Sequence, residues 1–382
     1  MASVLHVVSY FPPDRVGGVG EVVATVHREL LEAGHRSHVV TSGTSRGDPR
    51  VSRVARGSID FPLMSVRALA LAREADVVRL HHGQGLGLLA AIRLARVDVP
   101  VLLTLHVGVG AMAASLAPYR VAGHAFGRES GAAVMRRLLA MPVRALLDRA
   151  ALAMADDVSF IAASAARDNL DDHAAARARI IYNGVHLPAA SVESASPVDL
   201  LFVGADTPRK RVESLPLLLY AVRRRHPTAR LRIVGLSPES NPEILRLAER
   251  LRVSDGIEFA GVLRTGDLGA QYRAAKVLLV PSAYEGLPMV ILEAFSHGLT
   301  CVATAVSGHP EVVADGRNGY LVPLDDIEAM AERASSLLSD SGLRQSLGAA
   351  ARATVAARFT ARRQVDEYLD WYAGHVEARC GR

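Results

Sequence analysis

The chain has 382 residues, a length that predicts two domains, and half of its residues are hydrophobic, which allows a large apolar core. Two cysteines, Cys301 and Cys380, exclude a disulfide scaffold, and the formal net charge is +5. The chain has neither a run of about 18 uncharged apolar residues nor a basic segment before the first apolar run, so we expect no spanning helix, no signal peptide and a cytoplasmic location.

In the first half, short apolar runs alternate with helical runs. The apolar runs predict β-strands at Val4–Tyr10, His38–Ser42, Val77–His81, Val101–His106, Val158–Ala163 and Arg179–Tyr182. The intervening helical runs include Gly20–Ala33, Met64–Glu74 and Leu86–Arg96. Continuous apolar strands separated by helices are typical of a parallel sheet covered on both faces, so an α/β fold is predicted.

The stretch from 110 to 155 is long, helical in composition and rich in arginine. It is interpreted either as an amphipathic helix that contacts a membrane or as an ordinary helix with a solvated basic face. Residues 1–190 hold 21 arginines and 16 acidic residues and so carry the whole net charge. This favours an anionic partner, either a phosphorylated acceptor or an anionic membrane surface, although a generally basic surface is the simpler reading. Nucleic acid is not expected, because aromatic residues are few and do not alternate with basic ones.

A linker rich in small and polar residues follows at 188–197, and the alternation then restarts. The second half predicts strands at Leu200–Gly204, Leu231–Gly235, Ile257–Ala260, Lys276–Val280, Thr300–Ala303 and Gly319–Val322. We therefore expect a first domain at 1–190, a second domain at 191–360, and a C-terminal segment at 361–382 whose helix begins at Ala361.

Two glutamates lie eight positions apart near the end of the second half. Glu285 follows the predicted strand Lys276–Val280, and Glu293 lies within the helical run Met289–Ser296. The loop at the carboxyl end of a strand in an open α/β sheet is where nucleotides bind, and a helix N-terminus there suits a diphosphate. Glu293 is placed to accept ribose hydroxyls, and Glu285 to face the group attached to the phosphate.

These residues resemble the Glu-x7-Glu signature of retaining GT-B glycosyltransferases, specifically glycosyltransferase family 4 (glycosyl transferases group 1). The likeness includes Pro281-Ser282, Glu285-Gly286, Glu293-Ala294 and the downstream run Ser307–Val313, and it extends over essentially the whole chain. It implies a GT-B fold, with two Rossmann-like domains facing across a cleft and a last helix that crosses back to the first domain.

The resemblance also implies roles for individual residues. Donor binding falls to Gly18, Arg209, Lys210, Leu263, Glu285, Gly286, Leu287, Pro288 and Glu293. The acceptor side falls to Gly17, Gly18 and His106, and the catalytic residues are His106 and Glu285. His106 is expected at the carboxyl end of its strand, where its side chain faces the cleft. A lone histidine or a Gly-Gly turn at such a place is otherwise a structural feature.

One departure concerns the cations that meet the donor diphosphate. Lys210, one of two lysines in the chain, stands at the family's lysine position, but Ala205 replaces the usual arginine, so Arg209 or Arg211 is expected to supply the second cation. The chain has no Asp-x-Asp motif and no zinc-type cysteine and histidine spacing. We therefore expect no cofactor and no obligatory metal.

Two further motifs are ambiguous. Tyr182-Asn183-Gly184-Val185 resembles the turn at the end of the family's first domain, but Asn-Gly is also an ordinary tight turn. Ser164 and Arg167 could border the acceptor cleft, and a plain helix N-cap is an equal reading of Ser164.

The sequence thus predicts a metal-independent retaining glycosyltransferase that moves a sugar from a nucleotide-diphosphate sugar to an acceptor hydroxyl. The acceptor is either a cell-envelope glycan or glycolipid, or a small soluble metabolite such as an antibiotic-type intermediate or sugar phosphate. The alternatives are another nucleotide-sugar enzyme, such as an epimerase, and a nicotinamide-dependent oxidoreductase supported only by the glycines at 83, 85 and 87. A non-catalytic binding module is disfavoured by the presence of both glutamates, Lys210 and His106.

Overall fold

A computed structural model describes residues 1–12, 18–43, 47–54, 61–81, 86–106, 119–121, 124–126, 146, 149–188, 198–239, 241–263 and 265–380. The chain divides into two compact units. Unit 1 comprises Met1–Val109, Arg136–Gly184 and Ala361–Arg382, and unit 2 comprises Gly110–Met135 and Val185–Thr360. Each unit contains one large parallel sheet.

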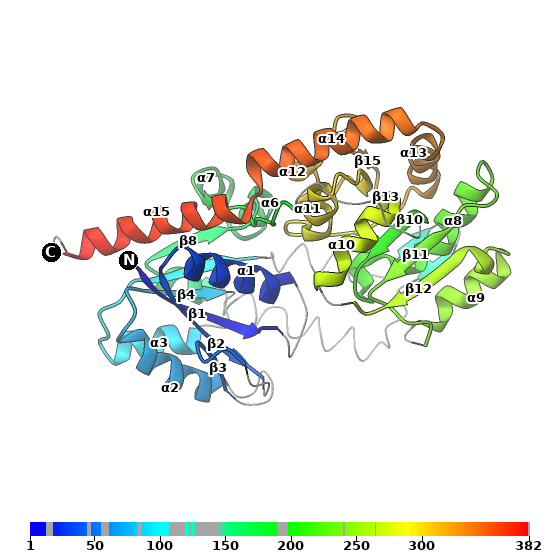
Figure 1. Ribbon diagram of the computed structural model, residues 1–382. Helices are drawn as coiled ribbons and strands as arrows, with labels where there is room; N and C mark the ends of the chain where they lie inside the picture. The colour runs from blue at the N-terminus through cyan, green and yellow to red at the C-terminus, as the bar shows by residue number, and fades with distance from the viewer. Residues whose placement is uncertain are drawn as a thin grey trace. The chain divides into compact units, whose positions relative to one another are not determined.

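Unit 1 is built on a seven-stranded sheet in the order β3-β2-β1-β4-β5-β8-β9, and every neighbouring pair is parallel (Figure 1). The strands are β1 Ser3–Tyr10, β2 Arg36–Ser42, β3 Val51–Arg53, β4 Val77–His81, β5 Val101–Leu105, β8 Asp157–Phe160 and β9 Arg179–Ile180. The helices are α1 Gly18–Glu32, α2 Phe61–Ala72, α3 Leu86–Leu94, α6 Ala163–Asn169, α7 Asp172–Ala176 and the C-terminal α15 Ala361–Cys380. The short edge strand β3 was not predicted from the sequence.

Helices cover both faces of this sheet, with α1 and α15 on one side and α2 and α3 on the other (Figure 1). Valines and leucines of the strands pack with α1 and with the aromatic residues of α15, which include Tyr368, Trp371 and Tyr372. The indole Nε1–H of Trp371 donates to Asp157 Oδ2 at 2.7 Å. The last helix therefore packs on the sheet of unit 1, as the fold prediction required.

Unit 2 contains a six-stranded parallel sheet in the order β12-β11-β10-β13-β14-β15. Its strands are β10 Val198–Val203, β11 Leu231–Val234, β12 Ile257–Gly261, β13 Ala275–Val280, β14 Cys301–Thr304 and β15 Tyr320–Val322. Its α-helices are α8 Leu215–Arg223, α9 Pro242–Arg250, α10 Thr265–Ala274, α11 Met289–Ser296, α12 His309–Val312, α13 Ile327–Ser339 and α14 Ser341–Arg358. Its short 3₁₀ turns are η3 Pro208–Lys210, η4 Val212–Ser214 and η5 Ser254–Gly256.

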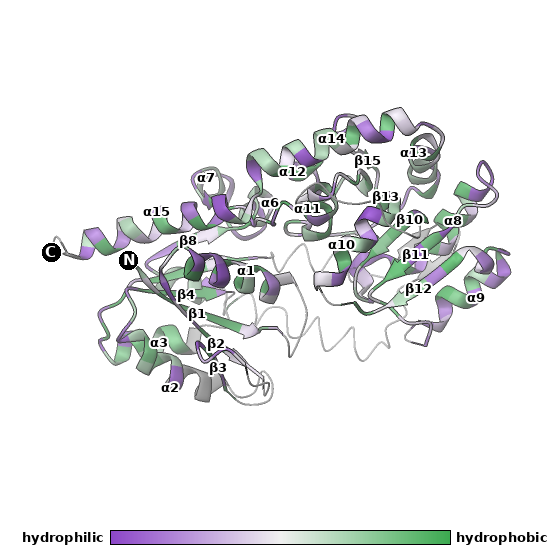
Figure 2. Ribbon diagram, in the orientation of Figure 1, coloured by the Kyte–Doolittle hydropathy of each residue, from purple (hydrophilic) through white to green (hydrophobic). Residues whose placement is uncertain are grey.

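The strand order in unit 2 is that of a doubly wound sheet, and it reverses between β10 and β13. Ligands in such sheets bind outside the carboxyl ends of the strands at this switch point. The strands are largely coloured as hydrophobic in Figure 2, whereas α15 alternates along its length. This contrast fits strands buried on both faces and a surface helix with one buried stripe.

The stretch 110–155 is only partly helical, which corrects the prediction. Tyr119–Val121 and His124–Phe126 form the antiparallel strands β6 and β7, and residues 149–154 are helical. Apart from residues 146 and 155, the remainder of this basic stretch, and linker residues 189–197, lie outside the described residues. None of the helices in the described part of the chain is long and apolar enough to cross a membrane.

The chain leaves unit 1 at Gly184 and returns to it at Ala361. Within unit 1, the side chain of Gln364 accepts a hydrogen bond from the Gly184 amide at 2.9 Å and donates one to Asn183 Oδ1 at 3.2 Å. Asn183 is buried. The Asn-Gly turn therefore has a structural partner at the start of α15.

Candidate active site

The carboxyl ends of the central strands in unit 2 carry the two predicted glutamates. Strand β13 is buried from Val277 to Val280, and the loop that follows leads into α11. No side chain caps the N-terminus of α11, where Pro288 occupies the cap position. This helix end is therefore directed at the switch point with its positive dipole end available to an anion.

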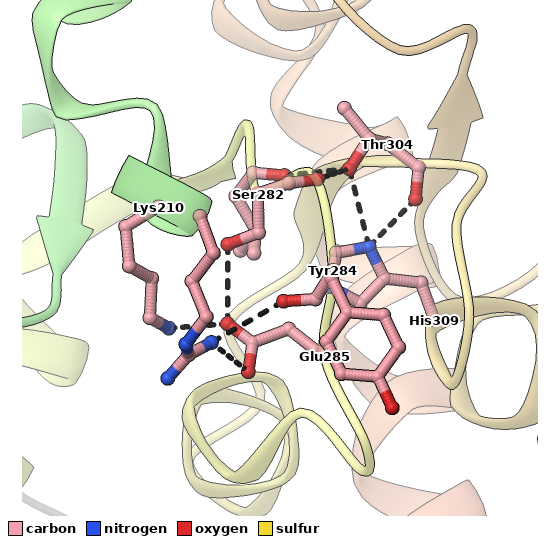
Figure 3. Close-up of polar contacts among 8 residues, drawn as sticks. Lys210, Ser282, Tyr284, Glu285, Thr304 and His309 are labelled. Carbon is pink, nitrogen blue, oxygen red and sulfur yellow. Dashed lines mark hydrogen bonds and ion pairs between the residues drawn. The ribbon is translucent and has the colours of Figure 1, made fainter. Parts of the chain in front are cut away.

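Glu285 is buried between two cations from the β10 side (Figure 3). Its Oε1 lies 2.6 Å from Lys210 Nζ, and its Oε2 lies 2.6 Å from Arg209 Nη1. Ser282 Oγ donates a third hydrogen bond to Oε1 at 3.1 Å. Both carboxylate oxygens are thus engaged by charged or hydroxyl donors, so the side chain has a fixed orientation.

The cations decide the ionisation of Glu285. Burial alone would raise its pKa, but the charges of Lys210 and Arg209 outweigh burial and lower the pKa from 4.5 to about 2. Glu285 is therefore ionised at neutral pH. The two cations and one carboxylate leave one net positive charge at the switch point.

A second layer supports the Glu285 loop. The His309 ring Nδ1 donates to the Thr304 carbonyl oxygen at 2.6 Å, and the Thr304 hydroxyl donates to the Ser282 carbonyl oxygen (Figure 3). Burial lowers the pKa of His309 to about 4 despite the opposing charge of Glu285, so the ring is neutral. These contacts connect β14 and α12 to the loop that holds Glu285.

Two glycines allow the loops after β13 and β14 to touch. A Cβ on Gly308 would lie 1.9 Å from the Gly286 carbonyl oxygen, and the Gly308 amide donates to the Glu285 carbonyl oxygen at 3.1 Å. No side chain fits at this approach. The downstream run Ser307–Val313 therefore supports the Glu285 loop through Gly308.

Glu293 lies in the second turn of α11 and is half-buried. The hydroxyl of Tyr272, on α10, donates to its Oε2 at 2.6 Å. The Tyr272 ring also stacks on His297, with ring centroids 5.8 Å apart. Burial and the Glu293 charge raise the pKa of Tyr272 well above its ordinary value, so the tyrosine remains a donor.

The loop after β10 holds the three candidate basic residues, two of which contact Glu285 while the third contacts Asp325. Lys210 is buried and Arg209 is about one-third exposed, and both contact Glu285. Arg211 adopts a left-handed backbone with φ 54° and lies buried with its Nε 3.4 Å from Asp325 Oδ1. Ala205 is exposed. Of the two arginines considered, Arg209 is therefore the one that accompanies Lys210.

The remaining predicted donor residues follow the same edge. Leu263 is half-buried in the segment after β12, next to the exposed Val262. Gly286, Leu287 and Pro288 are buried between Glu285 and the start of α11. The structure thus brings every predicted donor residue of unit 2 to the carboxyl edge of one sheet.

The carboxyl edge of the unit 1 sheet holds His106, immediately after β5. The ring is 2 % exposed, and its Nε2 lies 3.1 Å from His81 Nδ1. His81 in turn contacts His6. His106 therefore ends a row of buried histidines that the sequence analysis did not identify.

The glycine loop is only partly described. Gly18 begins α1 and is exposed, whereas Gly17 lies outside the described residues. A Cβ on Gly20 would lie 2.9 Å from the Tyr10 carbonyl oxygen, so α1 begins close against the end of β1. Ser164 lies inside α6, whose N-cap is Ala162, so the N-cap reading of Ser164 is wrong.

Comparison with known proteins gives the family. Residues 188–354 match the family model described as "Glycosyl transferases group 1", and residues 16–188 match "Glycosyltransferase Family 4". The D-inositol 3-phosphate glycosyltransferase of Xylanimonas cellulosilytica is 30 % identical over 96 % of this chain and 94 % of its own length. The chain belongs to this glycosyltransferase family. This family membership excludes the alternative of a nicotinamide-dependent oxidoreductase.

Other relatives of this glycosyltransferase match over different lengths. A D-inositol 3-phosphate glycosyltransferase of Kribbella flavida is 30 % identical over 88 % of this chain and 85 % of the relative. The N-acetyl-alpha-D-glucosaminyl L-malate synthase of Bacillus anthracis is 33 % identical, but the match covers only 38 % of this chain and 37 % of that enzyme.

Solved structures share the fold of this glycosyltransferase. The sucrose-phosphate synthase of Thermosynechococcus elongatus aligns with a TM-score of 0.80 at 21 % identity and covers 99 % of this chain and 100 % of that one. Anabaena HepE, in complex with UDP and glucose, aligns with a TM-score of 0.74 at 16 % identity and covers 98 % of this chain and 100 % of its own. The predicted GT-B fold is confirmed.

Tyr272 and the histidine row were missed in the sequence for different reasons. Tyr272 lies 21 positions before Glu293, and no local spacing connects residues that lie on two separate helices. The histidine row had a visible signal, since His6, Arg79 and His81 are polar residues within otherwise apolar strand runs. Such residues are costly to bury without partners and point to a specific contact.

Proposed function

We propose that this glycosyltransferase transfers a sugar with retention of configuration from a nucleotide-diphosphate sugar to an acceptor hydroxyl. The observation that carries the proposal is the cluster of Lys210 and Arg209 around the buried carboxylate of Glu285 at the N-terminus of α11. A structural ion pair needs one cation, whereas this site has two and retains a positive charge.

The cationic cluster is suited to a diphosphate. Its oxygens would be met by Lys210, Arg209 and the first amides of α11, and the same groups would stabilise the charge that develops on the leaving diphosphate. Lysine acts there as a compact point charge. This set of donors supports a reaction without an obligatory metal. Among the described residues, no cluster of three or more aspartate, glutamate, histidine or cysteine side chains could hold one.

Glu293 is proposed to bind the ribose of the donor. Its carboxylate is already oriented by the Tyr272 hydroxyl, and its half-buried position leaves it accessible from the switch point. The backbone near Leu263, after the edge strand β12 of the same sheet, is proposed to contact the base. The bound UDP and glucose in HepE, a protein of the same fold, are consistent with a nucleotide-sugar donor.

Glu285 and His106 are proposed to act on the transferred sugar. Glu285 would orient sugar hydroxyls, because its carboxylate is ionised and fixed by three donors. His106 and the glycines at 17 and 18 belong to the acceptor side. In a retaining reaction of this kind the acceptor hydroxyl attacks from the face that the diphosphate leaves, and the leaving phosphate accepts the proton. Catalysis is then mainly positioning and electrostatic stabilisation.

The acceptor is proposed to be anionic or to lie at an anionic surface, because the net charge of +5 falls in residues 1–190. A sugar phosphate and a membrane-linked glycan are the two alternatives. The D-inositol 3-phosphate named for two relatives is a phosphorylated cyclitol, which is a soluble anion comparable to a sugar phosphate.

The test is release of nucleoside diphosphate from a panel of UDP-, GDP-, ADP- and dTDP-sugars, with anionic acceptors, in the presence of EDTA. We expect one nucleotide to support turnover and proton NMR to show the same anomeric configuration in donor and product. Inversion at the anomeric carbon would overturn the retaining mechanism, and turnover only after addition of Mg²⁺ would overturn the metal-free proposal.

A further inference from the structure

One face of the unit 1 sheet changes from apolar to polar toward the carboxyl ends of its strands. On the face packed against α1 and α15, Val4, Val77 and Leu102 contribute to the apolar core. The strand registers place a second group on the same face, all of them no more than 2 % exposed: His6, Arg79, His81, Thr104 and His106. Strands buried on both faces are normally apolar, and buried polar groups are costly unless they are paired.

Three of these residues form a row that ends at the proposed acceptor side. His6 Nδ1 lies 3.4 Å from His81 Nε2, and His81 Nδ1 lies 3.1 Å from His106 Nε2. The ring centroids are 5.7 Å and 5.4 Å apart along the row. Each histidine comes from a different strand or strand end, namely β1, β4 and the residue after β5.

The two hydrogen bonds along the histidine row must share one donor-to-acceptor direction. A neutral imidazole has one N–H and one nitrogen lone pair, so each contact requires a donor on one ring and an acceptor on the next. Either His6 donates to His81 and His81 donates to His106, or both hydrogen bonds run the other way. The first order leaves His106 with its proton on Nδ1, and the second leaves it with its proton on Nε2.

His6 selects between the two orders. Its Nε2 is buried and has no hydrogen-bond partner among the described residues. If the row ran toward His6, this nitrogen would carry a buried N–H with no acceptor, whereas in the opposite order it carries only a lone pair. A buried unpaired N–H is the rarer and costlier of the two.

The charge of Arg79 reinforces this choice. Arg79 is the register partner of His6 on the neighbouring strand. Its guanidinium is held in place by a hydrogen bond to Thr104 Oγ1 at 3.1 Å, by another to the Tyr372 hydroxyl at 3.3 Å, and by the Tyr368 ring, whose centroid lies 3.4 Å from Arg79 Cζ. A fixed positive charge near His6 favours a lone pair over an N–H. Burial and Arg79 together lower the pKa of His6, so this ring is neutral.

We propose that His6 and His81 are positioning residues that hold the ring of His106 in its Nδ1–H tautomer, with Nε2 accepting a hydrogen bond from His81. Arg79 sets the direction of the row from its far end. The tautomer follows from the unit 1 geometry alone.

The consequence for catalysis rests on the proposed function. In this tautomer the His106 lone pair is engaged by His81 and its proton is on the other nitrogen. His106 then acts as a hydrogen-bond donor to a sugar or acceptor oxygen and does not remove the acceptor's proton. This agrees with a reaction in which the leaving phosphate accepts that proton.

The direct test is long-range ¹H–¹⁵N NMR of protein labelled with ¹⁵N-histidine, in which the His106 signals are assigned by their loss in His106→Gln. The coupling pattern reports which ring nitrogen carries the proton. We expect Nδ1 protonated and Nε2 unprotonated in the wild-type protein. A protonated Nε2 on neutral His106 would overturn the proposal, and this result requires no variant other than the one used for assignment.

Variants test the role of His6. His6→Leu removes the first donor, so we expect His106 to become a mixture of tautomers. We expect kcat to fall by about 10-fold, by analogy with the loss seen when the group that orients a metal-ligating histidine is removed. His6→Asn places an amide N–H near the Nδ1 position and is expected to restore both the wild-type spectrum and most of the turnover.

The control is His38→Gln, which changes a histidine on β2 that contacts Ser52 and not the row. It is expected to leave the His106 spectrum unchanged. An unchanged Nδ1–H signal in a folded His6→Leu protein would overturn the role of His6. If the wild-type protein shows the expected tautomer but no nucleotide sugar supports turnover, the proposed function fails and the tautomer assignment stands.

Discussion

Replacement of Glu285 by glutamine isolates the charge of the buried carboxylate at the switch point. Glutamine has the shape of the protonated acid but no charge, so Lys210 and Arg209 lose their counter-ion. The difference between a pKa of 4.5 and one of about 2 corresponds to about 3 kcal/mol at about 1.4 kcal/mol per pKa unit. We expect Glu285→Gln to lower the free energy of unfolding of unit 2 by about this amount at pH 7.

For a domain of this size, about 3 kcal/mol corresponds to a fall in Tm of roughly 6–12 °C. The assay is differential scanning calorimetry or far-UV circular dichroism, because Trp371, the chain's single tryptophan, lies on α15 in unit 1 and would report the wrong part of the molecule. The matched control is Glu328→Gln. Its pair with Arg224, at 2.8 Å, is only slightly longer than the 2.6 Å pairs of Glu285, but both side chains are more than half exposed, so a change below about 1 kcal/mol is expected.

The pH dependence of the Tm difference tests the same prediction in a second way. Because the folded-state pKa of Glu285 is depressed, its stabilisation is fully present above about pH 4.5 and is lost as the pH falls toward 2. The difference in Tm between wild type and Glu285→Gln should therefore be constant from pH 7 to about 5 and shrink below that. Equal Tm changes in Glu285→Gln and Glu328→Gln at pH 7 would refute the reasoning.

Three further predictions concern the donor. Glu293→Ala should weaken nucleoside diphosphate binding by 10-fold or more, because it removes the proposed ribose acceptor; unchanged affinity in calorimetry would remove that assignment. Tyr272→Phe deletes only the hydroxyl that orients Glu293, so we expect a smaller loss of donor affinity, and a loss larger than that of Glu293→Ala would show that the tyrosine acts in some other way. Turnover should persist in excess EDTA, and abolition that Mg²⁺ restores would contradict the metal-free account.

The sequence was sufficient for the architecture because parallel strands buried on both faces appear as apolar runs. The runs at Val77–His81 and Val101–His106 correspond to β4 and β5 within one residue. It failed where local composition was misleading. The arginine-rich stretch from 110 onward has helical composition, yet it contains the antiparallel strands β6 and β7, whose formation depends on pairing between the two strands.

The candidate site was predictable where its residues are close in sequence. Glu285 and Glu293 are fixed by one strand, one loop and one helix. The choice between Arg209 and Arg211 was not predictable, because it depends on the left-handed backbone at Arg211, which places that side chain beside Asp325. The contribution of Tyr272 was not predictable either, because its contact with Glu293 joins two separate helices.

The central claim is that Lys210 belongs to a nucleoside diphosphate site, and the chain's two lysines allow a matched test. Isothermal titration calorimetry would measure the binding of UDP, GDP, ADP and dTDP, without metal, to the wild type, Lys210→Met and Lys276→Met. Lys276→Met is the control, because Lys276 pairs with Asp199 at 2.8 Å and is partly exposed. We predict that one diphosphate binds the wild type and Lys276→Met equally, and binds Lys210→Met at least 10-fold more weakly. No binding by any of the four, or equal binding by Lys210→Met and the wild type, would contradict the account.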